Sequence, residues 1–152
     1  NYATDWCKWG IMMAKALNRG FLSFTGWNLL LDETGGPNIG PFFCGGLATR
    51  DSQTGELSYS GQYRALQHFS GFIKKNARIF TAKADIQGMN ISAFPRHSIP
   101  VEVCAAQNEK GGFVLQIINA AGEKAQLQYF YKGKWWYIES LPNSLSTVVF
   151  KD

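Results

Sequence analysis

One apolar run constrains the fold of this chain more than any other feature of its sequence. Between Gly20 and Leu31 the chain reads GFLSFTGWNLLL, with apolar residues at both odd and even positions over its central part. Side chains of a strand alternate between its two faces, so the run predicts a strand covered on both sides, as in a parallel sheet. Such a strand needs neighbours as cover and as hydrogen-bond partners.

Helical patterns flank this run. Apolar residues recur at three- and four-residue spacing over residues 5–18, with Thr4 or Asp5 as the N-cap. A second helical pattern follows Ser60, a candidate N-cap, and we expect it to end near Lys75-Asn76. Because helices and a doubly covered strand alternate, the first half of the chain is typical of an α/β fold.

The first half offers the apolar run no second parallel strand. Residues 35–46 are rich in turn-forming glycine and proline, and residues 51–56 read as a hairpin turn. The run therefore either joins strands of the second half or belongs to a larger β/α domain whose earlier strands precede Asn1. We favour the second interpretation, in which residues 1–76 are the last part of that domain.

After Asn76 the sequence changes to short strand-like runs separated by turn residues. Alternation in Val101-Glu102-Val103-Cys104 is typical of antiparallel strands with one buried face. We therefore expect an antiparallel β-sandwich over residues 77–152, packed directly on the first half because no flexible linker separates them. The expected strands are residues 77–84, 101–107, 112–119, 124–132, 134–140 and 145–151.

Composition excludes several functions. The net charge of +4 comes from 15 basic and 11 acidic residues scattered along the chain, which argues against nucleic-acid binding. Cys7, Cys44 and Cys104 lie far apart, so with only two histidines we expect neither a zinc site nor a dense disulfide framework. We expect no other metal and no cofactor. No uncharged apolar run is long enough for a transmembrane helix. The compartment stays open, secretion included.

Trp27 and Asn28 are the first candidate site residues. They lie where the apolar run meets its loop, and the carboxyl ends of strands build the ligand site in β/α folds. An indole can stack on a sugar ring, and an amide can bond to its hydroxyls. The alternative is a core tryptophan beside a turn-forming asparagine.

Other polar residues are weaker candidates. Asp32 and Glu33 are adjacent, whereas paired glycosidase carboxylates face each other from different strands, so we expect Asp32 and Glu33 to order the following turn. Ser58, Ser60 and Ser70 with His68 lack the sequence around a hydrolase nucleophile, and we expect His68 to be an interface residue.

The segment Trp135-Trp136-Tyr137 is a candidate carbohydrate-binding strip. Strand alternation places Trp135 and Trp136 on opposite faces, so we expect one of them in the core and the other exposed or at an interface.

The run GWNLLLDETGGPNIGPFFCGGL, followed by GQYRALQHFSGFIKKNARI, closely resembles the last barrel strand, loop and helix of family 30 glycoside hydrolases, the glucosylceramidase-like retaining enzymes. The resemblance covers most of residues 1–79, and the remainder is similar to the family's side β-sandwich in placement and length. It implies a (β/α)8 barrel enzyme that hydrolyses β-linked glycosides by double displacement, with two glutamates and without a metal.

The resemblance also assigns roles residue by residue. Trp27 matches the tryptophan of the eighth strand that lines the sugar subsite, and Asn28 matches the asparagine after it. Phe42, where glucosylceramidases often have an asparagine, is the third expected substrate-binding residue. The acid/base and nucleophile glutamates belong to the fourth and seventh strands. No glutamate here matches them, so we expect no catalytic residue in this chain.

The leading interpretation is therefore the carboxyl-terminal part of a retaining β-glycosidase, acting in carbohydrate or sphingolipid metabolism. It implies a β-glycoside or glycolipid substrate, and the barrel preceding Asn1 as its partner. The alternative is a non-catalytic carbohydrate-binding β-sandwich module, and a purely structural domain is the third hypothesis.

Overall fold

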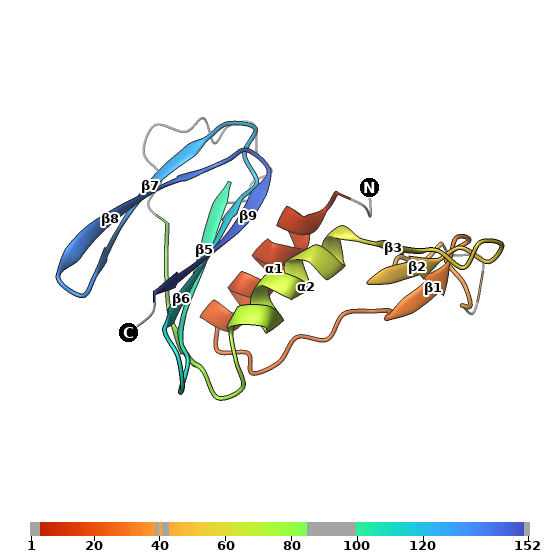
Figure 1. The fold of residues 1–152 in the computed structure, drawn as a ribbon, viewed down its shortest axis with the longest axis horizontal. Helices are drawn as coiled ribbons and strands as arrows, with labels where there is room; N and C mark the ends of the chain where they lie inside the picture. Colours follow the sequence, from red (N-terminus) through yellow and green to blue (C-terminus); the bar gives the residue numbers. More distant parts are fainter. Residues whose placement is uncertain (1–3, 39, 41–42, 85–99, 151–152) are drawn as a thin grey trace.

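The computed structural model describes residues 4–38, 40, 43–84 and 100–150. Two helices, α1 (Trp6–Asn18) and α2 (Gly61–Phe72), lie side by side on a four-stranded antiparallel sheet (Figure 1). In spatial order its strands are β4 (Arg78–Phe80), β5 (Val101–Gln107), β6 (Phe113–Asn119) and β9 (Ser144–Phe150).

Two smaller sheets lie at opposite ends of the molecule (Figure 1). One contains β1 (Leu30–Asp32), β2 (Ala48–Arg50) and β3 (Leu57–Tyr59), and the other is the hairpin of β7 (Ala125–Tyr131) and β8 (Lys134–Ser140). In the described part of the chain no helix is long and apolar enough to cross a membrane.

The two ends of α1 differ in how they are held. Asp5 is at the N-cap position, as one of the two expected residues, but its side chain makes no capping hydrogen bond and its Oδ2 atom accepts from Nε1 of Trp9 at 3.1 Å instead. At the other end Gly20 has a φ of +82°, and its N–H donates to the Leu17 carbonyl at 2.9 Å. The Phe21 N–H donates to the Ala16 carbonyl at 3.1 Å. These two bonds form a Schellman motif, which uses the left-handed conformation that glycine adopts without strain.

Helix α2 begins where the sequence predicts and ends earlier. The Ser60 hydroxyl accepts a hydrogen bond from the Tyr63 N–H at 3.2 Å, which confirms Ser60 as N-cap. The helix ends at Phe72 instead of near Lys75-Asn76. The Asn108 side chain donates to the Phe72 carbonyl at 2.8 Å and accepts from the Lys74 N–H at 2.9 Å. Both backbone groups therefore bond to Asn108 and not to further residues of the helix. Asn108 is distant in the sequence, so local spacing could not predict where the helix ends.

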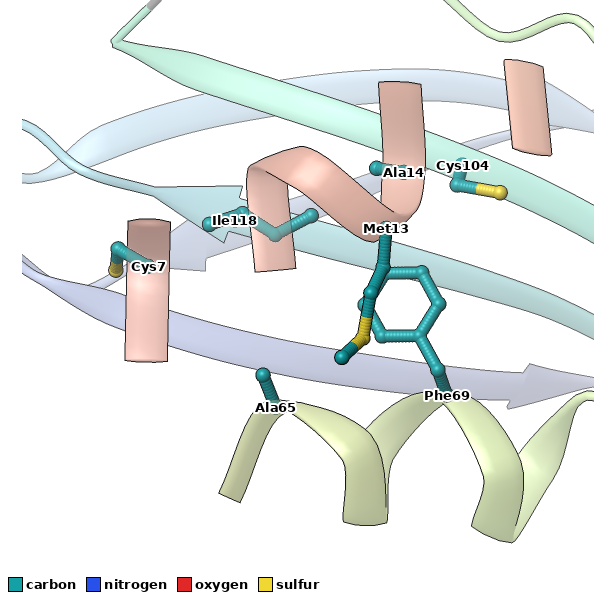
Figure 2. Packing of buried hydrophobic residues seen from close by; sticks show 7 residues of the cluster. All are labelled: Cys7, Met13, Ala14, Ala65, Phe69, Cys104 and Ile118. Atoms are coloured by element: carbon teal, nitrogen blue, oxygen red, sulfur yellow. The ribbon is translucent and has the colours of Figure 1, made fainter. Parts of the chain in front are cut away.

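One hydrophobic cluster joins the helices to the sheet (Figure 2). Gly10 allows α1 to approach closely, because a Cβ atom there would lie 2.6 Å from Cδ1 of Leu145. The helices and the later strands therefore pack directly on each other, as expected. The buried members are Cys7, Met13 and Ala14 of α1, Ala65 and Phe69 of α2, Cys104 of β5 and Ile118 of β6.

The hairpin β7–β8 packs against the opposite face of the sheet through a second cluster, which includes Val103, Ile117 and Ala125. This arrangement of sheets is compatible with the expected sandwich. Observed strands β5 to β9 agree with the predicted ranges within one residue, whereas β4 has only three residues of the expected range 77–84. The prediction of one buried face is wrong for β5 and β6, because helices cover one side and the hairpin covers the other.

The predicted buried strand between Gly20 and Leu31 is also wrong for this chain. Only Leu30–Asp32 forms a strand, and Phe21, Leu22 and Leu29 are 61%, 101% and 75% exposed. The described residues supply no neighbouring strand to cover residues 21–28. Contrary to the prediction, a parallel partner does exist further along the chain, because β1 pairs in parallel with β2.

Candidate functional site

Trp27 lies in the segment that connects α1 to β1. Its side chain is 78% exposed, so Trp27 is not a core residue in this structure. Asn28 is half-buried, and its carbonyl accepts a hydrogen bond from the Leu47 N–H at 2.9 Å. The Leu29 carbonyl accepts another from the Ala48 N–H at 3.1 Å. The backbone after Trp27 is therefore fixed to β2, while the indole ring remains accessible.

Helix α2 supports this segment through Gln62, a residue that sequence reasoning missed. Gln62 is only 3% exposed and lies against Gly26, where a Cβ atom would be 1.9 Å from its Nε2 atom. Ser60 also ties the start of α2 to β2, since its hydroxyl and its N–H both donate to the Leu47 carbonyl. A glycine directly before the candidate tryptophan was the only sequence signal of this close approach.

Asp32 organises the turn after β1. Its Oδ1 atom accepts hydrogen bonds from the Thr34 N–H at 2.9 Å, the Thr34 hydroxyl at 2.6 Å and the Gly36 N–H at 2.8 Å. The Thr34 hydroxyl is the largest cause of a lowered Asp32 pKa, because each of these bonds favours the charged carboxylate. This confirms the expected role of Asp32 in ordering the turn.

Glu33 binds a different segment. It accepts hydrogen bonds from the Ser52 hydroxyl and from the Ser52 N–H, and these bonds lower the pKa of Glu33. Asp32 and Glu33 therefore hold two separate turns, and both carboxylates are occupied by neighbouring donors. The arrangement does not support an acid/base pair.

The loop between β1 and β2 is tightly packed in places. Gly35 has a φ of +80°, and a Cβ atom there would be 2.7 Å from the Cys44 nitrogen. The Trp27–Asn28 and Gly36–Pro37 peptide bonds are cis. Phe42, the third expected substrate-binding residue, lies outside the described residues. Its neighbour Phe43 is 60% exposed.

His68 is an interface residue, as expected, and it does not contact a serine hydroxyl in the described part of the chain. Gln116 donates its amide to the His68 carbonyl at 2.7 Å, and Thr147 donates to Oε1 of Gln116 at 2.6 Å. Thr147 Oγ1 therefore accepts from Nδ1 of His68, at 2.8 Å. Burial lowers the pKa of His68. Ser60 and Ser70 donate to backbone carbonyls, so the hydrolase triad is not formed.

The described cysteines and acidic groups do not form a metal site. No group of three His, Cys, Asp or Glu side chains within these residues is placed to hold a metal ion. Cys7, Cys44 and Cys104 are free thiols. Burial raises the pKa of Cys7 to about 11 and that of Cys104 to about 12, so both stay protonated at neutral pH.

Trp135 and Trp136 point to opposite faces of the hairpin, as predicted. Trp136 faces the four-stranded sheet and contacts Phe150, with ring centroids 5.4 Å apart, but its side chain is 42% exposed, so the expectation that one of the two tryptophans lies in the core is wrong. Trp135 is 61% exposed on the other face, beside Phe130 at 5.3 Å.

The fold is shared with parts of larger proteins of known structure. The chain is similar to SrfJ from Salmonella typhimurium, with a TM-score of 0.82 and 21% identity over 97% of this chain and 30% of SrfJ. It is also similar to the endo-β1,6-glucanase BT3312, with a TM-score of 0.66 and 18% identity over 83% of this chain and 26% of that enzyme. The chain thus spans less than a third of either structure. No protein-family description and no curated protein matches it.

Proposed function

We propose that this chain is the carboxyl-terminal part of a retaining β-glycosidase similar to the family 30 glucosylceramidase-like enzymes. In this proposal residues 1–76 are the last part of a (β/α)8 catalytic barrel and residues 77–152 form its side β-sandwich. The substrate is a β-linked glycoside or glycolipid. The fold shared with an endo-β1,6-glucanase supports a relation to glycoside hydrolases in general.

The observation that carries the proposal is the state of residues 22–27. In the sequence they follow α1 and precede α2, two helices that pack on each other, yet their backbone groups make no backbone hydrogen bond to any other described residue. Leu22 is fully exposed. In a (β/α)8 barrel each strand pairs with a neighbour on both sides, and its helix covers the outside. Upstream barrel strands would supply both the missing hydrogen bonds and the missing cover.

The proposal includes three substrate-binding residues. Trp27 ends the segment with an exposed indole, which would stack on the apolar face of a sugar. Asn28 follows it at the point where the backbone is fixed to β2, and its amide would bond to a sugar hydroxyl. Phe42 would complete this wall of the active site from the loop. These three residues would bind and orient substrate.

The chemical step would need two facing carboxylates from the upstream barrel. A retaining mechanism uses one glutamate as general acid/base and another as nucleophile, with the carboxyl groups about 5 to 5.5 Å apart. Within the described residues, Glu33 is bonded to Ser52, and Glu102 is buried near Asn18 between α1 and β5. Neither faces a second glutamate in the contacts that hold it.

The test compares the chain with the longer reading frame that contains it. We expect the 152-residue chain to show no turnover of aryl β-glycosides. The longer protein should hydrolyse them and release the sugar with its anomeric configuration retained, as followed by proton NMR. Turnover by the chain alone, inversion of configuration, or an inactive but folded longer protein would each refute the proposal.

A further inference from the structure

The outer face of the β7–β8 hairpin carries exposed side chains that neither the core nor the proposed active site uses. Three cross-strand pairs line this face, and we call them the outer strip. All six side chains are exposed. The pairs are Gln126 with Glu139, Gln128 with Tyr137, and Phe130 with Trp135.

Half of the outer strip is aromatic. Phe130, Trp135 and Tyr137 are 61%, 61% and 72% exposed. The Phe130 and Trp135 rings lie side by side across the strands, with centroids 5.3 Å apart. Tyr137 lies two residues further along β8, which corresponds to about 7 Å along the strand. Neighbouring rings on one face are therefore spaced so that a chain of a few sugars can contact them.

The other half of the outer strip is polar without being basic. The side-chain amides of Gln126 and Gln128 have no hydrogen-bond partner among the described residues. Glu139, at the end of the strip, forms an ion pair with Lys124, with 2.8 Å between Oε1 and Nζ. A hollow of about 250 Å³ is lined by the two glutamines, Tyr137 and Glu139, among others. Hydrogen-bonding groups thus lie directly beside the rings.

The opposite face of the hairpin holds the outer strip in place. Leu127, Tyr129 and Ile138 pack into the cluster shared with the four-stranded sheet. The full register of β7 against β8 fixes which side chains face outward. Binding would therefore need little ordering of the backbone, and this lowers its entropic cost.

We propose that the outer strip is a binding surface for a neutral glycan chain. The rings would contact the apolar C–H faces of successive sugars, and the amides of Gln126 and Gln128 would bond to the hydroxyls. An apolar partner such as a lipid surface would bury these amides without hydrogen bonds, which is unfavourable. A nucleic acid or an anionic membrane would need basic side chains, and none is in the strip.

This inference goes beyond the proposed function. It concerns binding without bond cleavage, on the hairpin that lies at the opposite end of the molecule from β1, β2 and β3 (Figure 1). It does not depend on whether a barrel precedes the chain. A binding measurement therefore tests it separately from any measurement of hydrolysis.

The experiment is affinity electrophoresis of the full chain in native gels that contain laminarin, pustulan or hydroxyethylcellulose, three neutral glucans with different β-linkages. Mobility is compared with that in a gel without glucan, so that self-association of the chain, which affects both gels alike, is not read as binding. We expect at least one of them to retard the chain. Trp135→Ala and Tyr137→Ala should each weaken its binding about tenfold, the effect of losing one stacking contact. Circular dichroism would verify that both variants are folded, and two variants guard against the misfolding of one.

Trp136→Phe is the matched control, since Trp136 is adjacent in sequence but lies on the other face of the hairpin, and phenylalanine keeps a ring against Phe150. It should bind as the unchanged chain does. Hydrolysis of a small aryl β-glycoside by the longer protein should be the same with and without Trp135→Ala. Absence of retardation by all three glucans would overturn the proposal. So would a loss confined to Trp136→Phe, or binding of phosphatidylcholine–phosphatidylserine vesicles that Trp135→Ala abolishes.

Discussion

Gly26 and Gln62 lie so close together that a side chain on Gly26 would force the Gln62 amide to move. A Cβ atom on Gly26 would lie 1.9 Å from Nε2 of Gln62 and 3.2 Å from its Cδ. Because Gln62 is buried at the start of α2, this contact couples the position of the segment before Trp27 to the position of the helix.

Gly26→Ala should therefore lower the free energy of unfolding by about 1 kcal/mol, the low end of the cost of overpacking, because the overlapping Nε2 atom is the end of a flexible side chain that can shift. The measurement is urea unfolding followed by circular dichroism. Gly71→Ala is the control, because it lies within α2 with no atom within 4 Å of the added methyl, and it should be neutral or stabilising by up to about 1 kcal/mol. Adding Gln62→Ala to Gly26→Ala should recover part of the loss. Equal effects at Gly26 and Gly71 would contradict this account of the contact.

Trp27→Ala in the longer protein should reduce kcat/KM by an amount that corresponds to about 1 to 3 kcal/mol of lost stacking. The melting temperature should change little, because the proposed place of the ring is the wall of the active site and not the core. Steady-state kinetics on an aryl β-glycoside and a thermal melt would be measured together, with Trp27→Phe as the variant that keeps a ring. A collapse of the melting temperature with unchanged activity per folded molecule would show that Trp27 is a core residue.

The 152-residue chain expressed alone should self-associate. Phe21, Leu22, Leu29 and Leu30 are all exposed, and exposed apolar groups beside unpaired backbone promote association. Light scattering after size exclusion would measure the mass, and amide exchange would measure protection over residues 21–31. A monodisperse monomer whose residues 21–31 are as protected as β5 and β6 would mean that this segment finds its partners within the chain.

Glu102 should make stability fall as the pH rises. Its side chain is 8% exposed, and its Oε2 atom has no hydrogen-bond partner among the described residues. Burial raises the Glu102 pKa above its ordinary 4.5, although Lys15, Asn18 and Arg19 oppose the shift. The folded state therefore binds the Glu102 proton more tightly than the unfolded state, and this proton binding stabilises the fold. The contribution is fully present below the unfolded pKa and is lost as the pH rises through the folded pKa.

Glu102→Gln removes this titration and keeps the shape of the side chain. The variant should therefore be more stable than the unchanged chain near pH 7 and should lose that advantage near pH 4. Urea unfolding at both pH values is the measurement. A variant that is less stable than the unchanged chain near pH 7 would show that the ionised carboxylate stabilises the fold.

The sequence by itself determined the elements whose signals are local. Asp5 and Ser60 as N-caps, the hairpin turn within residues 51–56 and the ranges of β5 to β9 all follow from side chains within a few positions of each other. The opposite orientations of Trp135 and Trp136 follow from the two-residue period of a strand. At the candidate site, Asp32 was expected to order its turn because an aspartate bonds readily to nearby backbone N–H groups.

Tertiary structure alone decided which surfaces are covered and which distant groups meet. Glu102 and Gln116 look like surface positions in an alternating strand, yet both are buried because α1 and α2 cover that face of the sheet. Phe21 and Leu22 belong to an apolar run that looks buried, yet both are exposed, because no described strand lies beside them. Gln62 could not be connected to Gly26 from spacing, since their contact depends on how α2 packs. Burial is a property of neighbours in space, and local sequence records only a side chain's preference for it.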